Sequence, residues 1–121
     1  MSLTTIALTA AGSALGALLR FELGRWIGRW LGTRLPWATF TVNLLGCFLA
    51  GGLLAGSAEL SPGVHTLLAA GVLGGFTTVS AFALEVHLLI RRGYELGAAV
   101  YLLASLLVML LATIAGYRLV A

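Results

Sequence analysis

The chain alternates long apolar runs with short charged stretches. The apolar runs cover residues 3–19, 35–58, 60–84 and 96–117. Each run reaches or nearly reaches the roughly 20 residues that a helix needs to cross a hydrocarbon core about 30 Å thick. A bilayer offers no water to bond an exposed backbone, and these runs lack the alternation of a barrel strand, so helices are favoured. The pattern predicts an all-α membrane protein with four transmembrane helices.

The connections between the predicted helices are too short to hold a separate soluble domain. We therefore predict a single four-helix transmembrane domain over residues 1–121, with approximate spans at 3–31, 36–58, 63–90 and 95–118. The first span continues amphipathically through Trp26 and Trp30 and has no basic segment before it, so we expect a retained helix rather than a signal peptide. Pro36 marks the start of the second helix, where its missing N–H matters least.

Composition narrows the possible functions. The chain is 60% hydrophobic and 9% charged, whereas a soluble domain carries about 25% charged residues, which argues against a water-soluble enzyme. The basic residues are arginines that lie between the apolar runs, which fits membrane orientation better than nucleic-acid binding. Cys47 is the only cysteine, and His65 and His87 have no metal-binding spacing. No catalytic motif is present, so we expect neither an enzyme nor a nucleic-acid partner.

Two patterns of small residues indicate helix contacts. Gly12 and Gly16 form a G-x-x-x-G pair, which lets two helix backbones approach closely in a bilayer. In the second helix, polar and small residues fall on one narrow face, at i, i+4, i+7 and i+11: Thr39, Asn43, Gly46 and Ala50. An asparagine is costly at membrane depth unless it bonds to another helix or faces a water-filled path. The pattern does not decide between helix packing and a pore-lining role for Asn43.

The third run contains a stretch that is poorly suited to a continuous helix. Residues 71–82 read G-V-L-G-G-F-T-T-V-S-A-F, with two adjacent glycines followed by two threonines and a serine. We predict a helix break near the middle of this span. Carbonyls freed by a break suit a hard cation, whereas hydroxyls, amides and aromatic edges suit an anion. A simple packing kink is the alternative.

The remaining polar residues are less specific. Tyr101 and Ser105 lie at i, i+4 on the fourth helix, a weak signal by itself. Glu85 follows the apolar part of the third run, and we expect it to be a solvated charge at a helix end rather than a charge at the mouth of a pore.

Three blocks of the sequence match the pattern of one family in the same order. Residues 12–20 read G-S-A-L-G-A-L-L-R, residues 36–48 read P-W-A-T-F-T-V-N-L-L-G-C-F, and residues 71–82 form the stretch given above. These blocks resemble the Fluc/CrcB family of small fluoride channels, with Ala38 in place of a family glycine. The likeness covers nearly the whole chain.

The resemblance implies a fluoride-selective ion channel that lowers cytoplasmic fluoride by passive export across the cell membrane. It implies an antiparallel, dual-topology dimer with fluoride pathways at the subunit interface. It also implies a structural Na⁺ at the dimer centre, held by the backbone carbonyls of Gly74 and Thr77.

By motif position, the resemblance also assigns roles to side chains. Arg20 would be a structural arginine near a helix end, and Gly75 would lie where two subunits meet. The fluoride pathway would include Asn43, Ser80, Phe82, Tyr101 and Ser105, and the structural residues would be Gly12, Gly16, Arg20 and Gly75. Two positions depart from the family, because Val79 replaces a phenylalanine and Ala81 replaces a threonine.

Two other functions are weighed against the channel. A small proton-coupled multidrug exporter needs a membrane-embedded glutamate in its first helix, and residues 3–19 contain no acid. A non-conducting membrane assembly subunit would use Asn43 and the hydroxyl-rich stretch for packing alone.

The arginines are distributed unevenly about the four predicted spans. Arg118 lies on the side of the termini, whereas Arg25, Arg29, Arg34, Arg91 and Arg92 lie on the other side, together with Arg20 if it is counted. Basic loops stay in the cytoplasm, so the sequence predicts at least partial commitment to one orientation, with a paralogous subunit as the antiparallel mate. If residues 20–34 instead lie along the membrane interface, their charge counts for less and a homodimer remains the expectation.

Overall fold

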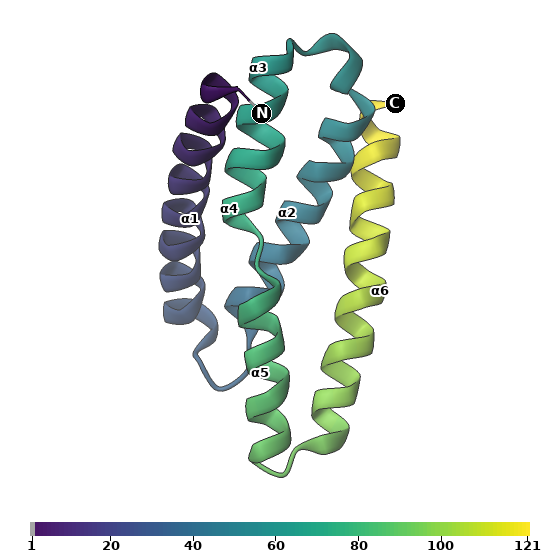
Figure 1. Ribbon diagram of the computed structural model, residues 1–121. Helices are drawn as coiled ribbons and strands as arrows, with labels where there is room; N and C mark the ends of the chain where they lie inside the picture. Colours follow the sequence, from purple (N-terminus) through teal and green to yellow (C-terminus); the bar gives the residue numbers. More distant parts are fainter. Residues whose placement is uncertain (1) are drawn as a thin grey trace.

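The computed structural model describes residues 2–121, and four long helical spans run side by side through it (Figure 1). All four are long and apolar enough to cross a membrane, which confirms the predicted all-α membrane fold. The third span consists of α3, a π-helix η2, α4 and α5, and a short 3₁₀ turn η1 precedes it. The elements are α1 (Leu3–Leu31), α2 (Trp37–Ala55), η1 (Ser57–Glu59), α3 (Pro62–His65), η2 (Thr66–Leu73), α4 (Gly74–Phe76), α5 (Val79–Arg91) and α6 (Glu95–Val120).

Local sequence signals explain where several helices begin and end. The Ser2 hydroxyl accepts a hydrogen bond from the Thr5 backbone N–H at 3.1 Å and caps the start of α1. Ser61 caps α3 in the same way, with Pro62 in the first helical turn. Gly32 ends α1 with a φ of 77°, a backbone conformation that favours glycine. The ends of α1 and the start of α3 therefore follow from capping residues, in addition to the length of the apolar runs.

The third span is interrupted near its middle, as the sequence predicts. Thr77 and Thr78 are extended, with ψ values of 153° and 121°. Helix α5 then begins at Val79, where the Thr78 hydroxyl accepts a hydrogen bond from the Ala81 N–H at 3.1 Å. The break lies at the two threonines, whereas Gly74 and Gly75 remain helical. Figure 1 shows this short extended segment between α4 and α5.

Glycines bring α1 against the first half of the third span. A Cβ added to Gly12 would lie 2.7 Å from the Gly71 Cα, and one added to Gly16 would overlap the Val72 carbonyl oxygen. A Cβ on Gly75 would overlap the Ser13 carbonyl oxygen of α1. These backbones are therefore too close for any side chain at the three positions, which is the packing that G-x-x-x-G pairs permit.

A second pair of glycines brings α2 against α6. A Cβ on Gly51 would overlap the Thr113 carbonyl oxygen, and one on Gly116 would overlap the Phe48 carbonyl oxygen. We refer to Gly12, Gly16, Gly71, Gly75, Gly51 and Gly116 together as the glycine contacts. They join α1 to the third span and α2 to α6, and many large hydrophobic side chains stay exposed on the outside of the bundle.

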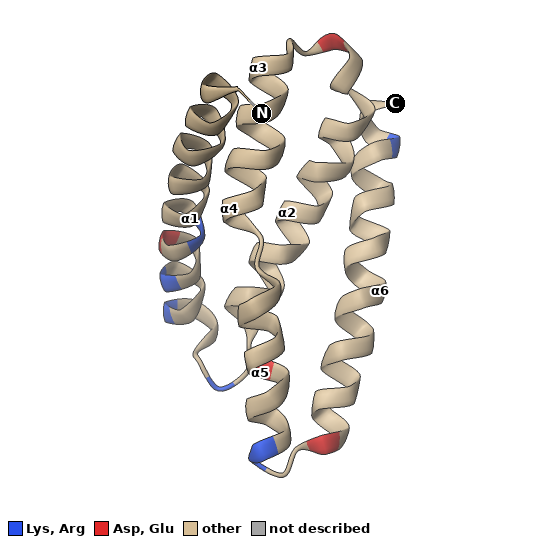
Figure 2. Ribbon diagram, in the orientation of Figure 1, with Lys and Arg blue, Asp and Glu red and all other residues tan. Residues whose placement is uncertain are grey.

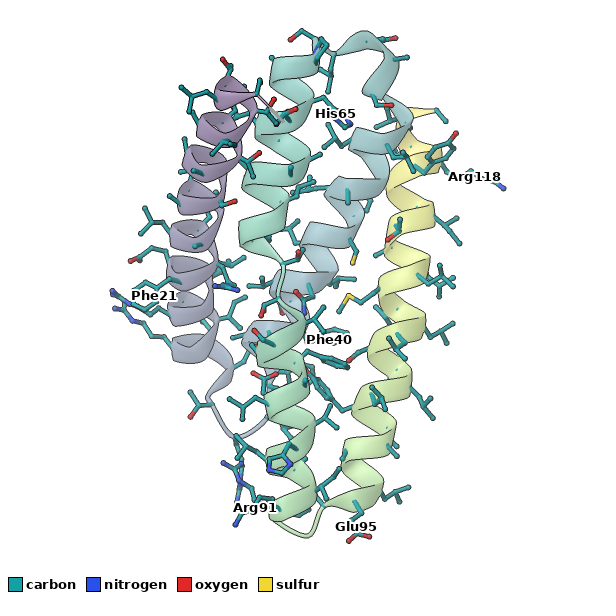
Figure 3. The ribbon with its side chains drawn as sticks, in the orientation of Figure 1. Phe21, Phe40, His65, Arg91, Glu95 and Arg118 are labelled. Carbon is teal, nitrogen blue, oxygen red and sulfur yellow. The ribbon has the colours of Figure 1, made fainter. Side chains whose placement is uncertain are left out.

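The two ends of the bundle differ in charge. Both termini lie at the same end as η1, and Arg118 lies near that end on α6 (Figures 1 and 3). Figure 2 shows basic residues on the second half of α1, in the connection from α1 to α2, and at the end of α5. Arg91 and Glu95 flank the connection from α5 to α6 (Figure 3). The opposite, basic end therefore carries the two connections that the sequence predicts to share one side.

Candidate functional site

The break in the third span is held by a side chain from α2. The Asn43 Nδ2 donates a hydrogen bond to the Thr78 carbonyl at 2.8 Å, and the Asn43 Oδ1 accepts one from the Thr78 N–H at 2.8 Å. Thr78 is only 7% exposed, so its backbone groups need partners inside the protein. Asn43 therefore bonds both polar backbone groups of this extended residue, and one N–H of its amide remains for another acceptor.

These bonds remove the usual helical donors from two carbonyls. In a continuous helix, the N–H of Thr78 would bond to the Gly74 carbonyl and the N–H of Ala81 to the Thr77 carbonyl. Here the Thr78 N–H donates to Asn43, and the Ala81 N–H donates to the Thr78 hydroxyl. The carbonyls of Gly74 and Thr77 are thus freed from their helical partners. They are the two oxygens that the family pattern assigns to sodium.

Glu85 lies at the centre of a second set of hydrogen bonds. Its Oε1 accepts a bond from the Thr39 hydroxyl at 2.6 Å, and its Oε2 accepts one from the Tyr101 hydroxyl at 3.0 Å. It therefore connects α2, α5 and α6 and is only partly exposed. The expectation of a solvated charge at a helix end is wrong, because α5 continues to Arg91 and Glu85 is bonded inside the bundle.

An aromatic pair lies next to this glutamate. The rings of Phe82 and Tyr101 have centroids 5.2 Å apart and planes inclined by 39°. The edge of an aromatic ring carries partial positive charge, to which an anion is attracted. The Ser80 hydroxyl lies 3.3 Å from the Thr78 hydroxyl, at the start of the same helix. We call Thr39, Asn43, Thr78, Glu85 and Tyr101 the polar cluster.

Two cavities meet at Ser105. One, of about 680 Å³, extends along the break and includes Asn43, Thr77 and Phe82 in its lining. The other, of about 690 Å³, includes Phe40 and Tyr101; Figure 3 shows Phe40 in the space beside α5 and α6. Ser105 lines both cavities and is 3% exposed, and its hydroxyl has no hydrogen-bond partner within residues 2–121. A buried hydroxyl without a partner needs an explanation, and a bound ion or water supplies one.

A third cavity lies on the α1 side of the break. It has a volume of about 340 Å³, and its lining includes Arg20, Thr39, Thr78 and Ala81. Arg20 therefore faces the region of the break from within α1. It is not near the end of that helix, as the family pattern suggested, because α1 continues to Leu31.

Comparison with known proteins identifies the family. The model of the family described as "CrcB-like protein, Camphor Resistance (CrcB)" matches residues 7–117. The chain belongs to the CrcB family. It is similar to proteins named fluoride-specific ion channel FluC. The one from Thermus thermophilus is 45% identical over 114 residues, which are 93% of this chain and 90% of the relative. The one from Erythrobacter litoralis is 43% identical over 118 residues, which are 91% of this chain and 87% of the relative. A third such protein, from Agrobacterium fabrum, is 42% identical over 117 residues, or 94% of each chain.

Family membership makes the chain a multi-pass membrane protein whose relatives are named as channels, not as enzymes. The structure brings the predicted pathway residues of this CrcB protein to one region. Asn43, Phe82 and Ser105 line the cavity along the break, and Tyr101 lines the adjoining one. Ser80 lies beside the break, where its hydroxyl is 3.3 Å from that of Thr78.

The structure places the predicted structural residues elsewhere. Gly12 and Gly16 are glycine contacts between α1 and the third span, not part of the cavities. Gly75 packs against Ser13 of α1 within the same chain, where a Cβ would overlap the Ser13 carbonyl oxygen. This contact accounts for the glycine by itself, and a place for Gly75 where two subunits meet stays a prediction.

Sequence reasoning missed two members of the polar cluster as site residues. By itself, Glu85 predicts a solvated helix end because it follows an apolar run, although the apolar residues continue to Ile90. Thr39 stands out in the sequence only as part of the narrow face of polar and small residues on the second helix. An acid and a threonine that both fall on polar faces of neighbouring spans are a signal for a bond across helices, and the sequence contained both.

Proposed function

We propose that this chain forms a fluoride-selective channel through which fluoride leaves the cytoplasm down its gradient. The similar proteins are named fluoride-specific ion channels, which supports the choice of ion. The single observation that carries the site is the buried Ser105 hydroxyl, which has no partner within residues 2–121 and lies where two cavities meet. A pathway for a small anion needs donors of this kind.

The chemistry of fluoride fits the groups along these cavities. Fluoride is small and tightly hydrated, so a selective path replaces its water with several close donors. The free N–H of Asn43 and the hydroxyl of Ser105 are such donors, and the Ser80 hydroxyl lies beside the break, next to that of Thr78. The ring edges of Phe82 and Tyr101 carry partial positive charge, which also attracts an anion. No coupling to another ion is needed, because fluoride that enters as neutral HF dissociates inside and leaves down its gradient.

A structural Na⁺ is part of the proposal. Its ligands are the backbone carbonyls of Gly74 and Thr77, both freed from their helical donors. Carbonyl oxygens at a helix break suit a hard cation. When bound, the ion supplies positive potential beside the anion path. Two carbonyls leave the cation incompletely coordinated, so the remaining ligands come from the same carbonyls of a second subunit.

An antiparallel dimer completes the site in this proposal. The large cavity beside the break runs along an outer face of the bundle, where Val79 is 80% exposed and Leu106 is 57% exposed. A second subunit that packs there in the opposite direction encloses the cavity and brings two breaks together. Val79 stands where the family has a phenylalanine, so each pathway of a homodimer has one aromatic edge fewer.

The mate is proposed to be a paralogous subunit of opposite orientation. Five of the seven arginines lie toward the end of the bundle opposite the termini, with Arg20 not counted because it faces the break, and this charge favours that end in the cytoplasm. C-terminal reporter fusions test this proposal. A signal from outside the cytoplasm is expected; equal signals from both sides, with no second gene needed for fluoride resistance, would restore the homodimer.

Fluoride efflux from liposomes tests the function. Liposomes that contain the protein, alone or with a paralogous subunit, should release fluoride but retain chloride when the membrane potential is collapsed. Ser105→Ala should slow the release, whereas Ser57→Ala, in the turn after α2, is the matched control and should not. If neither preparation releases fluoride, the proposed channel function is wrong.

A further inference from the structure

A small cavity opens beside Glu85 at the basic end of the bundle. It has a volume of about 110 Å³, enough for a few waters or a partly hydrated small anion. Its lining joins the connection from α1 to α2 with one face of α5. The lining residues are Thr33, Arg34, Pro36, Glu85, Leu88, Leu89 and Arg92.

Two arginines from separate elements contribute to this lining. Arg34 comes from the connection between α1 and α2, and Arg92 directly follows α5. Both are exposed, and among residues 2–121 neither forms an ion pair. The carboxylate nearest to them in the lining, that of Glu85, is already bonded to Thr39 and Tyr101. The two guanidinium groups are therefore available to an anion from solution.

Stabilisation of a helix end explains only one of them. Arg92 caps the C-terminal end of α5, where a cation interacts favourably with the helix dipole. Arg34 lies in a connection and serves no helix end. Its presence in the same cavity as Arg92 needs another reason.

The cavity adjoins the space that leads to the proposed pathway. Arg34, Pro36, Leu89 and Arg92 also line the cavity of about 690 Å³, whose lining extends to Tyr101 and Ser105. Ser105 in turn lines the cavity along the break. Cavities that adjoin one another through shared lining residues therefore lie between the two arginines at the basic end and the unpartnered Ser105 hydroxyl.

We infer that Arg34 and Arg92 form the anion-collecting mouth of the fluoride pathway at the basic end of the subunit. The inference rests on the proposed function and adds an entrance to it. Two positive charges without an ion pair, in the lining of one small cavity, raise the local concentration of anions and the rate at which they enter. The negative charge of Glu85 in the same lining repels an anion, so an anion attracted by the two arginines moves on and is not held there.

The experiment compares fluoride flux at two ionic strengths. The double variant Arg34→Gln/Arg92→Gln is reconstituted as the full chain, and flux is measured at low fluoride with potassium isethionate as the added salt. At 10 mM total salt the screening length is about 30 Å, and at 1 M it is about 3 Å. We expect flux to fall roughly three- to tenfold at low salt and to match the parent protein at high salt.

Two further variants separate charge from structure. Arg34→Lys/Arg92→Lys keeps both charges and should retain most of the low-salt flux. Arg29→Gln removes a charge at the same end, on α1 and outside the lining, and should have a smaller effect. Equal loss at both salt concentrations would mean a structural role and would overturn the inference, as would unchanged flux at low salt. If the parent protein itself carries no fluoride flux, the proposed function is wrong, and this result is distinct from a failure of the inference about Arg34 and Arg92.

Discussion

The third span is held by two kinds of contact that differ on the two sides of its break. Before the break, Gly71 and Gly75 lie directly against the backbone of α1, with no side chain between them. At and after the break, Asn43 bonds to Thr78, and Glu85 bonds to two neighbouring helices. The glycine contacts set the distance between helices and have no donor to offer an ion. The polar cluster holds the same span with hydrogen bonds, and one N–H of the Asn43 amide is left free for an anion.

This difference predicts which property each region controls. Substitutions at the glycine contacts should lower stability, because no small movement relieves an overlap between two backbones. Substitutions in the polar cluster should lower fluoride flux while the subunit still folds. The variants below test the division, from the largest expected effect to the smallest.

Gly16→Ala should cause the largest loss of stability. The added Cβ would overlap the Val72 carbonyl oxygen and lie 2.8 Å from the Phe76 backbone nitrogen. We expect a decrease in unfolding free energy of about 3 kcal/mol, measured by denaturant titration in detergent.

Gly97→Ala is the matched control for that variant. At Gly97 on α6 the nearest atom to an added Cβ is the Tyr94 Cβ, at an ordinary 3.6 Å. Alanine there should be neutral or stabilising, by up to about 1 kcal/mol. Equal stability of the Gly16 and Gly97 variants would show that the glycine contacts do not hold the bundle.

Asn43→Asp should cause the largest loss of flux. Aspartate keeps the shape but has no N–H for the Thr78 carbonyl, and it places a negative charge beside that oxygen and on the anion path. We expect fluoride efflux to fall roughly ten- to a hundredfold, which corresponds to about 1.4–2.7 kcal/mol. Size-exclusion chromatography should still find assembled protein. Unchanged efflux would take Asn43 out of the pathway.

Glu85→Gln should have a smaller effect of the same kind. Glutamine has one carbonyl oxygen in place of two carboxylate oxygens, so either Thr39 or Tyr101 loses its acceptor. We expect efflux to fall about tenfold, from the loss of one bond to a charged group. Glu95→Gln, in the first turn of α6, is the control and should conduct like the parent. If both variants conduct equally well, the bonds of Glu85 matter for packing alone.

These contacts also explain how much the sequence alone could predict. The four spans follow from the length of the apolar runs, a property that each stretch carries by itself. The break follows from residues 71–82 for the same reason. Its position at Thr77 and Thr78, rather than at the two glycines, depends on Asn43, which is 35 residues away from Thr78 in the chain. A local pattern of glycines and threonines cannot contain that information.

Glu85 gives the same lesson for the site. Its partners lie 46 residues before it and 16 after it, and only the packing of three helices brings them together. Read alone, a glutamate after an apolar run predicts a solvated end. The family pattern assigned Asn43, Phe82, Tyr101 and Ser105 to one pathway without a view of these bonds, and the structure adds that Asn43 also holds the break.

Phe82→Ile should give the smallest loss. Isoleucine keeps most of the volume but removes the ring that pairs with Tyr101 at a centroid distance of 5.2 Å. A tilted aromatic pair contributes about 0.5–1.5 kcal/mol beyond its area, so we expect flux to fall roughly threefold with assembly intact. Phe21→Ile on the outer surface of α1, where Phe21 is 60% exposed, is the control and should leave flux unchanged. If Phe82→Ile instead lowers stability as much as Gly16→Ala does, this ring belongs with the packing contacts, and the division between the two sides of the break fails at Phe82.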